Sequence, residues 1–190
     1  MAISVSSPIP LDIIDRLAAG DNLLLSGIVY TARDAAHRRL VDALKEGNTL
    51  PFEITGQTLY YVGPSPARPG RASGAAGPTT SGRMDACTPP LLAAGLRVMI
   101  GKGDRSAEVK EAMRCSRAVY LTATGGAGAL LGKAVQKAEV IAYPELGPEA
   151  VLRLEVENMP VIVAYDTGGG DIFASGKSKY RKKQDEGGQQ

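Results

Sequence analysis

Short apolar segments alternate with helical segments along the chain, and this alternation constrains the fold more than any other feature of the sequence. Residues 22–32 predict a strand, and residues 33–46, where apolar residues recur at helical spacing, predict a helix that follows at once. The same order returns in two further pairs, residues 96–101 with 104–114 and residues 118–123 with 126–133. Strands that alternate with helices are typical of a parallel sheet covered by helices.

Three more segments have the character of strands. Residues 58–63 and 138–143 are short and apolar. Residues 150–166 predict two strands separated at residues 158–160, because apolar and charged residues alternate in the first half and the second half is continuously apolar. The predicted fold class is therefore α/β, with a mixed sheet flanked by helices.

Length and composition favour one domain. The chain has 190 residues, of which 44% are hydrophobic, and this is enough for one core. We assign residues 1–173 to this domain. Residues 174–190 are polar and basic, with too little apolar surface to order themselves, and they predict a disordered tail.

The charge balance and the cysteines exclude several kinds of protein. The 22 basic and 20 acidic residues nearly cancel, which leaves no long-range field for binding nucleic acid or an acidic membrane. The start of the chain has no basic and apolar leader, and no stretch approaches about 18 apolar residues, so we expect neither secretion nor a membrane span. Cys87 and Cys115 fit neither a zinc site nor a disulfide scaffold, which predicts a reducing, cytoplasmic location.

The segment GPTTSGRMD, at the end of a proline- and glycine-rich loop over residues 64–78, is the first candidate site. The hydroxyl residues and the glycine at positions 79–82 can bring O–H and N–H groups close to an anion, and Arg83 can bind a carboxylate with two parallel hydrogen bonds. The same residues could instead begin a helix, with Thr80 or Ser81 as the N-cap. Both interpretations stay open on the residues alone.

Two further segments could contact an anion. Lys102 lies between Gly101 and Gly103 at a predicted strand end, where a lysine can extend into a cleft; an ordinary exposed turn lysine is the alternative. The spacing is not that of a nucleotide-binding P-loop. The glycine cluster at residues 125–128 precedes a predicted helix, and close packing of that helix on a strand is its more common explanation.

Arg33 and His37 lie one turn apart at the start of the helix predicted over residues 33–46. A cation there could attract an anion together with the helix dipole, although a solvated basic face is the more common explanation. His37, the only histidine, could carry a proton, and a packing role is the interpretation we favour. No Ser/His/Asp order, metal-ligand set or close acidic pair accompanies these residues, so the sequence resembles half of an active site.

Seven segments over residues 31–171 together resemble one family. They closely resemble the β subunit, or carboxy-terminal domain, of the iron–sulfur fumarate and tartrate hydro-lyases, the class I fumarase family. The segments are TARDAAH, GPTTSGRMD, TPPLLAAGL, MIGKGDRS, TGGAGALL, YPELGPEAV and MPVIVAYDTGGGD. The first twenty residues and the tail lie outside the resemblance, which covers about three quarters of the chain.

The resemblance implies a swivelling β/β/α domain that works with an α subunit. In that family the α subunit or domain holds a [4Fe-4S] cluster through three of its own cysteines, so Cys87 and Cys115 are not expected to bind it. A chain of this length suggests the two-subunit form within a larger hetero-oligomer. The reaction is the reversible hydration of fumarate to (S)-malate, or the dehydration of L-tartrate to oxaloacetate, with the open iron of the cluster as Lewis acid on the substrate hydroxyl.

The resemblance also assigns a catalytic residue. Thr79 matches the family's catalytic threonine, which is thought to act as a base at the carbon beside the substrate carboxylate, with help from an aspartate of the α subunit. A free threonine hydroxyl is a very weak base at neutral pH. Neighbouring cations must therefore stabilise its alkoxide and the developing enediolate.

The remaining matches concern substrate binding and support. The contacts to the substrate carboxylates fall on Arg33, Arg83 and Lys102. The substrate-binding turn is completed by Thr80, Ser81 and Gly82, and structural or supporting roles are assigned to Asp85 and His37.

We therefore expect the β subunit of a [4Fe-4S] fumarate hydratase, active only with its α subunit and acting on a dicarboxylate. One alternative is the β subunit of L-tartrate dehydratase, which shares the motifs. Another is a non-catalytic carboxylate-binding or assembly module, and the joint presence of Thr79, Arg83 and Lys102 argues against it. Neither nucleic acid nor a membrane is an expected partner.

Overall fold

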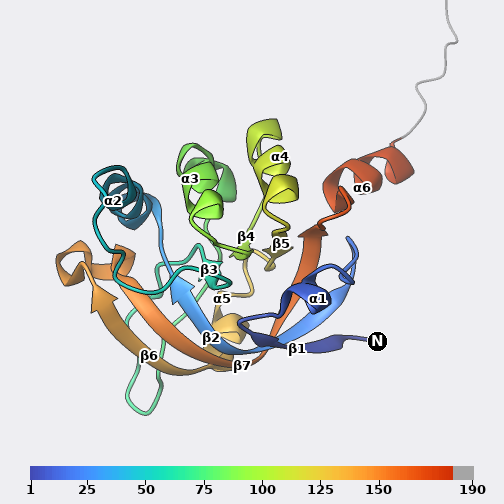
Figure 1. Cartoon of the computed structure of the whole chain (residues 1–190). Helices are drawn as coiled ribbons and strands as arrows, with labels where there is room; N and C mark the ends of the chain where they lie inside the picture. Colours follow the sequence, from blue (N-terminus) through green and yellow to red (C-terminus); the bar gives the residue numbers. More distant parts are fainter. Residues whose placement is uncertain (182–190) are drawn as a thin grey trace, which may run out of the picture.

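A mixed sheet organises the part of the chain that the computed structural model describes, residues 1–181 (Figure 1). Its seven strands lie in the order β1-β2-β3-β4-β5-β7-β6. They are β1 (Ile3–Ser7), β2 (Asn22–Thr31), β3 (Thr58–Tyr60), β4 (Val98–Gly101), β5 (Val119–Thr122), β6 (Val135–Ala142) and β7 (Val151–Tyr165). Strands β1 to β5 are parallel to one another, whereas β7 runs antiparallel to β2, β5 and β6. The predicted mixed sheet flanked by helices is confirmed.

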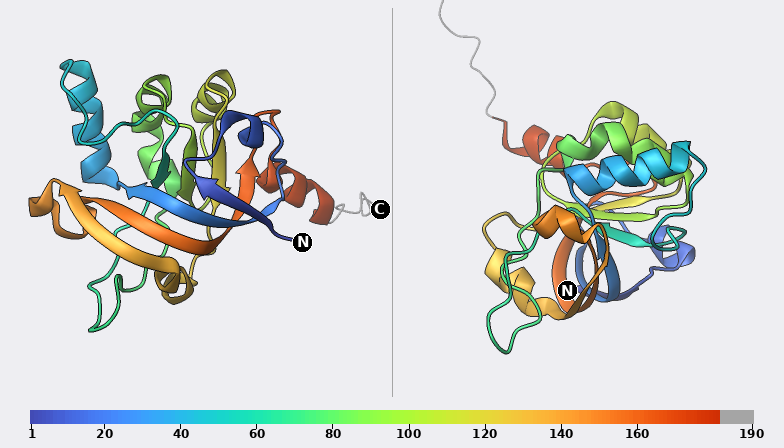
Figure 2. Two further views of the ribbon diagram at one scale, coloured as in Figure 1. Left: turned by 60° about the horizontal axis from the view of Figure 1, so that its bottom comes forward. Right: turned by 90° about the vertical axis from the view of Figure 1, so that its left-hand side faces the viewer.

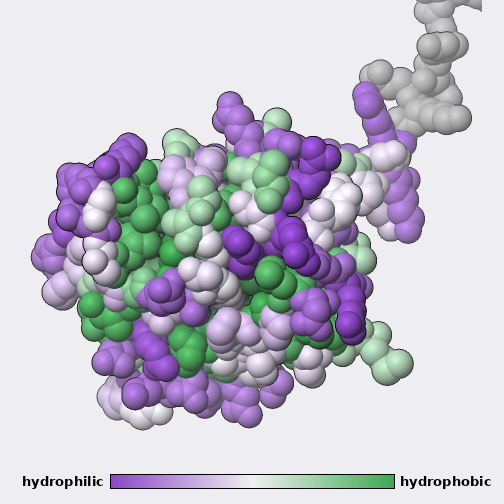
Figure 3. Space-filling model, viewed as in Figure 1, coloured by the Kyte–Doolittle hydropathy of each residue, from purple (hydrophilic) through white to green (hydrophobic). Residues whose placement is uncertain are grey.

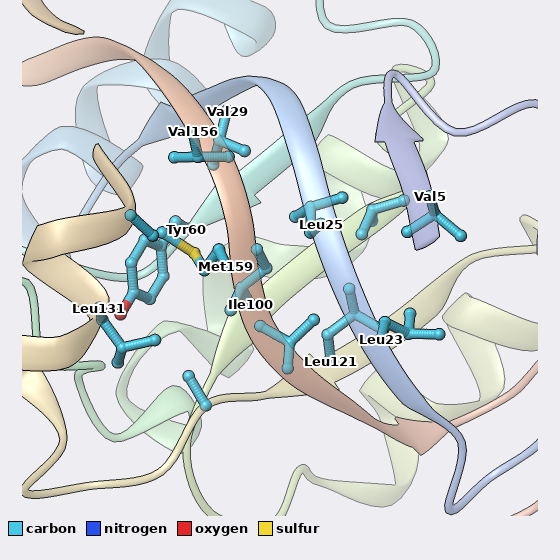
Figure 4. Packing of buried hydrophobic residues seen from close by; sticks show 14 of the residues in the cluster. Val5, Leu23, Leu25, Val29, Tyr60, Ile100, Leu121, Leu131, Val156 and Met159 are labelled. Carbon is cyan, nitrogen blue, oxygen red and sulfur yellow. The ribbon is translucent and has the colours of Figure 1, made fainter. Parts of the chain in front are cut away.

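The two long strands, β2 and β7, close most of this sheet into a ring. β2 pairs with β3 through Tyr30 and Thr31, and it also pairs with β7 along most of its length. β7 pairs with β5 as well, so the hydrogen bonding runs from β2 through β3, β4, β5 and β7 back to β2. Apolar side chains from every strand of the ring point toward one another inside it (Figure 4), among them Leu25, Tyr60, Ile100, Leu121 and Met159.

A second core lies between the sheet and three helices. Figures 1 and 2 show α2 (Asp34–Lys45), α3 (Thr88–Ala93) and α4 (Ala107–Cys115) side by side over one face. Successive side chains of a strand point to opposite faces, so Leu59 and Met99 belong to this second core while Tyr60 and Ile100 face the ring interior. All four are fully buried, which explains why these strands are apolar without alternation.

The helices predicted over residues 33–46, 104–114 and 126–133 are present as α2, α4 and α5 (Gly128–Ala134). Helix α4 begins at Ala107 rather than at residue 104, because Ser106 is its N-cap and the Ser106 hydroxyl accepts a hydrogen bond from the Val109 N–H at 3.3 Å. The other short helices in the first 171 residues are α1 (Leu11–Ile14) and the 3₁₀ helices η1 (Ser81–Cys87) and η2 (Pro144–Glu149).

The prediction of two strands over residues 150–166 is wrong, because β7 is one strand of 15 residues. Asn158, where a break was expected, has a φ of 51° and stays within the strand. Its N–H donates a hydrogen bond to the Ser26 hydroxyl on β2 at 3.0 Å. Asparagine tolerates this left-handed conformation better than most residues, so a local irregularity replaces the predicted break.

Part of the predicted disordered tail is helical. Helix α6 spans Ile172–Tyr180, and the Asp171 carboxylate caps it by accepting hydrogen bonds from the Phe173 and Ala174 N–H groups. An aspartate at the N-cap stabilises a helix that composition alone does not predict. The rest of the predicted tail, residues 182–190, lies outside the described residues.

The surface shown in Figure 3 mixes hydrophilic and hydrophobic side chains, and on that face the hydrophobic ones form several separate patches. Exposed large apolar residues include Leu11, Leu130 and Val140, which lie on different elements. Within residues 1–181, none of the helices combines the length and the apolar character that a membrane crossing requires.

The conformation of Asn158 makes a prediction about stability. Replacement by valine should lower the free energy of unfolding by about 1–2 kcal/mol, because a β-branched residue is strained at positive φ, whereas Asn158→Gly should leave it unchanged or higher. Urea unfolding measures both values. Glu157→Val, at the neighbouring exposed position of the same strand, is the control. An equal loss in Asn158→Val and Glu157→Val would contradict the backbone explanation.

Candidate active site

The candidate residues lie where the parallel strands β2 to β5 end. Arg33 follows β2, Lys102 follows β4 and Gly125 follows β5. Neighbouring parallel strands end at one edge of a sheet, so these segments come together although they are far apart in the sequence.

The segment GPTTSGRMD lies between the ends of β3 and β4. The Thr79 N–H donates to the Tyr61 carbonyl at 2.6 Å, and the Lys102 N–H donates to the Thr79 carbonyl at 3.2 Å. The Ser81 N–H donates to the Lys102 carbonyl at 2.9 Å, so that Thr80 and Lys102 form a parallel bridge. Backbone hydrogen bonds on both sides therefore hold Thr79, which is half-buried, next to Lys102.

Lys102 extends across the end of β5 toward the glycine cluster at residues 125–128. A methyl group placed on Gly125 would lie 3.7 Å from the Lys102 Nζ atom. Gly103 has a φ of 81°, which lets the chain turn away directly after the lysine. Within residues 1–181 Lys102 forms no ion pair with a carboxylate. Its ammonium group is therefore available to an anionic ligand.

Ser81 lies beneath the turn rather than on its open side. It is fully buried, and its hydroxyl lies 2.8 Å from the Tyr120 hydroxyl, which donates to the Gly103 carbonyl at 3.0 Å. A Cβ atom on Gly101 would lie only 1.9 Å from the Ser81 Oγ atom, so glycine is required there. The Ser81 side chain therefore supports the turn from below, and the role of Ser81 in substrate binding stays a prediction.

The alternative interpretation of the same segment, as the start of a helix, is confirmed in part, because η1 begins at Ser81. Thr80 occupies the N-cap position of η1, but its side chain accepts no capping hydrogen bond there, and the Ser81 hydroxyl is engaged with Tyr120. Thr80 and Gly82 are instead exposed on the turn.

Asp34 joins two of the candidate arginines. The Arg83 Nε atom donates to Asp34 Oδ1 at 2.9 Å, and an Arg33 terminal nitrogen lies 3.9 Å from Asp34 Oδ2. The same Arg33 nitrogen lies 3.6 Å from a Glu149 carboxylate oxygen, and the other Glu149 oxygen accepts from the Ala35 N–H at 2.9 Å. Sequence reasoning missed Asp34 and Glu149, although TARDAAH and YPELGPEAV contain them.

A buried ion pair anchors the turn from its other end. The Arg105 Nε atom donates to Asp85 Oδ1 at 2.7 Å, and another Arg105 nitrogen donates to the Thr88 hydroxyl at 2.7 Å. The Arg105 guanidinium lies 5.3 Å and 5.2 Å from the ring centres of Tyr61 and Tyr120. Arg105 is only 4% exposed, so it serves the structure rather than a ligand, and the supporting role predicted for Asp85 agrees with this contact.

His37 is buried and electrically neutral. Its Nδ1 atom donates to the Arg33 carbonyl at 3.0 Å, and its ring packs edge-on against Tyr61. Burial lowers the pKa of His37 to about 4, and the Arg33 carbonyl only partly opposes this effect. The histidine supports the backbone that presents Arg33, as the favoured packing interpretation predicts.

The described residues do not fit an iron–sulfur cluster. Cys87 is half-buried, and burial raises the pKa of its thiol, which disfavours the thiolate that binds iron. Cys115 is exposed on α4. Among residues 1–181, no three His, Cys, Asp or Glu side chains converge in a way that could hold a metal ion.

Comparison of the sequence with known protein families shows which family the chain belongs to. Residues 1–176 match the family described as Fumarase C-terminus. The chain belongs to the fumarase C-terminus family. The resemblance drawn from the sequence motifs is confirmed, and the match also takes in the first twenty residues, which the motifs left outside.

The match covers different shares of the length of individual relatives. The aerobic class I fumarate hydratase of Escherichia coli K12 is 39% identical over 153 residues, which are 80% of this chain and 28% of that enzyme. Mitochondrial fumarate hydratase 1 of Leishmania major is 37% identical over 90% of this chain and 32% of its own length. A Methanocaldococcus jannaschii protein, provisionally named L(+)-tartrate dehydratase subunit beta, is 35% identical over 91% of this chain and 92% of its own length. The chain thus spans about a third or less of these fumarate hydratases.

The burial of His37 predicts its titration. Because the folded pKa is about 4 and the unfolded pKa about 6.5, the unfolded chain takes up this proton first as the pH falls, so stability should decrease from about pH 6.5 to pH 4. His37 is the only histidine, so the imidazole proton NMR signal of the untagged chain reports it directly. A midpoint near 6.5 in the folded protein would show that the ring is in contact with solvent, contrary to this structure.

Proposed function

We propose that this chain supplies half of the active site of a hydro-lyase that interconverts fumarate and (S)-malate. The observation that carries the proposal is the juxtaposition of Thr79 with Lys102, at an edge of the sheet where Arg33 and Arg83 are also joined through Asp34. Membership of a family whose named relatives include fumarate hydratases supports it. Hydro-lyase chemistry on a dicarboxylate needs a contact for each of the two carboxylates and a base. The three cations can supply the contacts, and Thr79 can supply the base.

The three cations differ in how free they are to bind a substrate. Arg33 is held between Asp34 and Glu149, whereas Arg83 uses its Nε atom for Asp34 and is 52% exposed. The outer nitrogens of Arg83 can therefore bind a carboxylate in the two-pronged manner of a guanidinium. We propose that Lys102 and Arg83 bind the substrate carboxylates and that Arg33 adds positive charge behind them.

Thr79 is the proposed proton acceptor in malate dehydration and the proton donor in fumarate hydration. Thr79 accepts the proton as an alkoxide, which carries negative charge before the transfer, and removal of the proton from the carbon beside a carboxylate moves that charge onto the carboxylate as an enediolate. The Lys102 ammonium group, on the adjacent backbone segment, would stabilise both charges, and fixed backbone hydrogen bonds limit reorganisation of the turn. The hydroxyl of an unassisted threonine is too weak a base for this role.

The proposal requires a partner chain. Because the described residues do not fit a metal cluster, we assign the [4Fe-4S] cluster expected for this family to an α subunit that docks at the carboxyl-terminal edge of the sheet. The name of the M. jannaschii relative, which describes a subunit beta, supports a hetero-oligomer. The cytoplasmic location predicted from the cysteines remains a prediction.

L-Tartrate dehydratase is the second candidate activity. The name of the M. jannaschii relative, provisionally L(+)-tartrate dehydratase subunit beta, supports it, since that protein is 35% identical over 91% of this chain. Tartrate carries one more hydroxyl group than malate. Assays of the assembled enzyme with fumarate, (S)-malate and L-tartrate distinguish the two, because a site built for one substrate prefers it in kcat/KM.

Removal of the Thr79 hydroxyl tests the proposed base. Thr79→Ala in the enzyme assembled with its α subunit should abolish turnover, and Thr79→Ser should retain part of it, because serine keeps a hydroxyl group at the same position. Turnover is measured by fumarate absorbance, and assembly by gel filtration. Thr49→Ala, at an exposed threonine outside the candidate site, is the matched control. Substantial activity in Thr79→Ala would rule out the assignment.

Removal of the proposed carboxylate contacts should reduce catalysis without preventing assembly. Lys102→Met and Arg83→Gln should each lose about 2–4 kcal/mol of transition-state stabilisation, the scale of one preorganised electrostatic contact. The measurement is kcat/KM at constant ionic strength, with Lys137→Met on β6 as the control. A non-catalytic assembly module would instead lose subunit association in these variants and have no turnover to begin with.

A further inference from the structure

We propose a second anion site, separate from the candidate active site, that binds a phosphate group between the loop over residues 64–78 and helix α5. A cavity of about 280 Å³ lies there, and we call it the basic pocket. Its polar lining consists of Ser65, Arg68, Arg71, Ser73 and Lys133. None of these residues belongs to the candidate active site, and in Figures 1 and 2 the loop and α5 lie on the side of the sheet opposite helices α2 to α4.

The pocket is formed by a loop that is bonded in place. The Ser65 N–H donates to the Ala75 carbonyl at 3.0 Å, and the Ser65 hydroxyl accepts from the Ala75 N–H at 2.8 Å. The Ala76 N–H donates to the Gly128 carbonyl at the start of α5. A Cβ atom on Gly132 would lie 2.1 Å from the Gly74 carbonyl oxygen, so loop and helix are in close contact. The backbone at both ends of the loop is thus held in place without a ligand.

The charges of the basic pocket are unbalanced. Arg68, Arg71 and Lys133 bring three positive charges to it, and no Asp or Glu appears among its lining residues. None of the three forms an ion pair with a carboxylate elsewhere in residues 1–181. Cations brought together in this way repel one another, and a bound anion removes that repulsion.

Ser73 gives an independent indication of a ligand. Ser73 is 8% exposed and lines the pocket, yet its hydroxyl is buried and has no hydrogen-bond partner within residues 1–181. A buried hydroxyl without a partner is unfavourable. The other such atoms of the described chain belong to Arg33, Asp34 and His37, at the candidate active site. Ser73 is thus a buried polar group without a hydrogen-bond partner at a second place in the structure, away from the candidate active site.

The arrangement suits a phosphate group, either as the free ion or as the end of a small phosphorylated metabolite. Guanidinium groups bind phosphate oxygens in pairs, and the ammonium and hydroxyl groups can donate to the remaining oxygens. The volume accommodates a phosphate and a few further atoms but falls below the usual size of a larger cofactor site. The inference is independent of the proposed function, and either can fail without the other.

The test is a titration of the full-length, ¹⁵N-labelled chain with inorganic phosphate, compared with potassium chloride at equal ionic strength. Saturable NMR shifts should centre on the amides of Arg71, Ser73 and Lys133. The double variant Arg68→Gln/Arg71→Gln should raise the apparent Kd for phosphate at least tenfold. The charge-matched control Arg16→Gln/Lys45→Gln, on exposed side chains outside the pocket, should bind as the wild type does.

Ser73→Ala provides a readout that a structural role would not give. The variant should bind phosphate about fivefold more weakly, while its urea midpoint without phosphate should stay equal or rise, because an unpaired buried hydroxyl has been removed. Tighter binding of glycerol 3-phosphate than of phosphate would identify a phosphorylated metabolite as the ligand, and the reverse order would identify the free ion.

Three outcomes would overturn the proposal. The first is the absence of saturable binding, and the second is a set of shifts centred on Lys102 and Arg83. The third is unchanged phosphate affinity in Arg68→Gln/Arg71→Gln together with a loss of α-subunit binding, which would make the basic pocket a contact for the partner protein.

Discussion

The buried ion pair of Arg105 and Asp85 is the interaction on which the rest of the candidate site depends. It joins the segment after β4 to η1, while Arg105 also reaches Thr88 at the start of α3 and the rings of Tyr61 and Tyr120. Loss of one partner from such a pair costs about 3–5 kcal/mol, because the other charge is left buried. The ion pair therefore holds η1, which directly follows the turn that carries Thr79, against the segment after β4.

Much of the site could be predicted from local patterns. The strands and helices follow from apolar periodicity, and the resemblance to the family grouped Arg33, Arg83 and Lys102 as substrate contacts. The seven motifs also indicated the family to which the chain belongs. The same patterns could not separate the two interpretations of the turn, because only the tertiary contact of Ser81 with Tyr120 shows that its hydroxyl is engaged below the turn.

Other features depend on contacts between distant residues, which no local pattern contains. Asp34 meets Arg83 across 49 positions of the sequence, and Arg105 meets Asp85 across 20. The closure of the sheet by β2 and β7 rests on register between strands that lie far apart in the chain. Residues 158–160 were interpreted as a break because the pattern changes there from alternating to continuously apolar, whereas the pairing with β2 that holds Asn158 inside β7 cannot be seen in the sequence.

The position of Asp34 means that Arg83 already holds a carboxylate before any ligand arrives. Its Nε atom is occupied, and its outer nitrogens face outward on a side chain that is half exposed. In the proposed function, a dicarboxylate would bind those nitrogens through one carboxylate and Lys102 through the other, and Asp34 would stay in place. A monocarboxylate would gain only one of these contacts. Asp34 thus fixes one side of the Arg83 guanidinium and leaves the exposed side for a ligand.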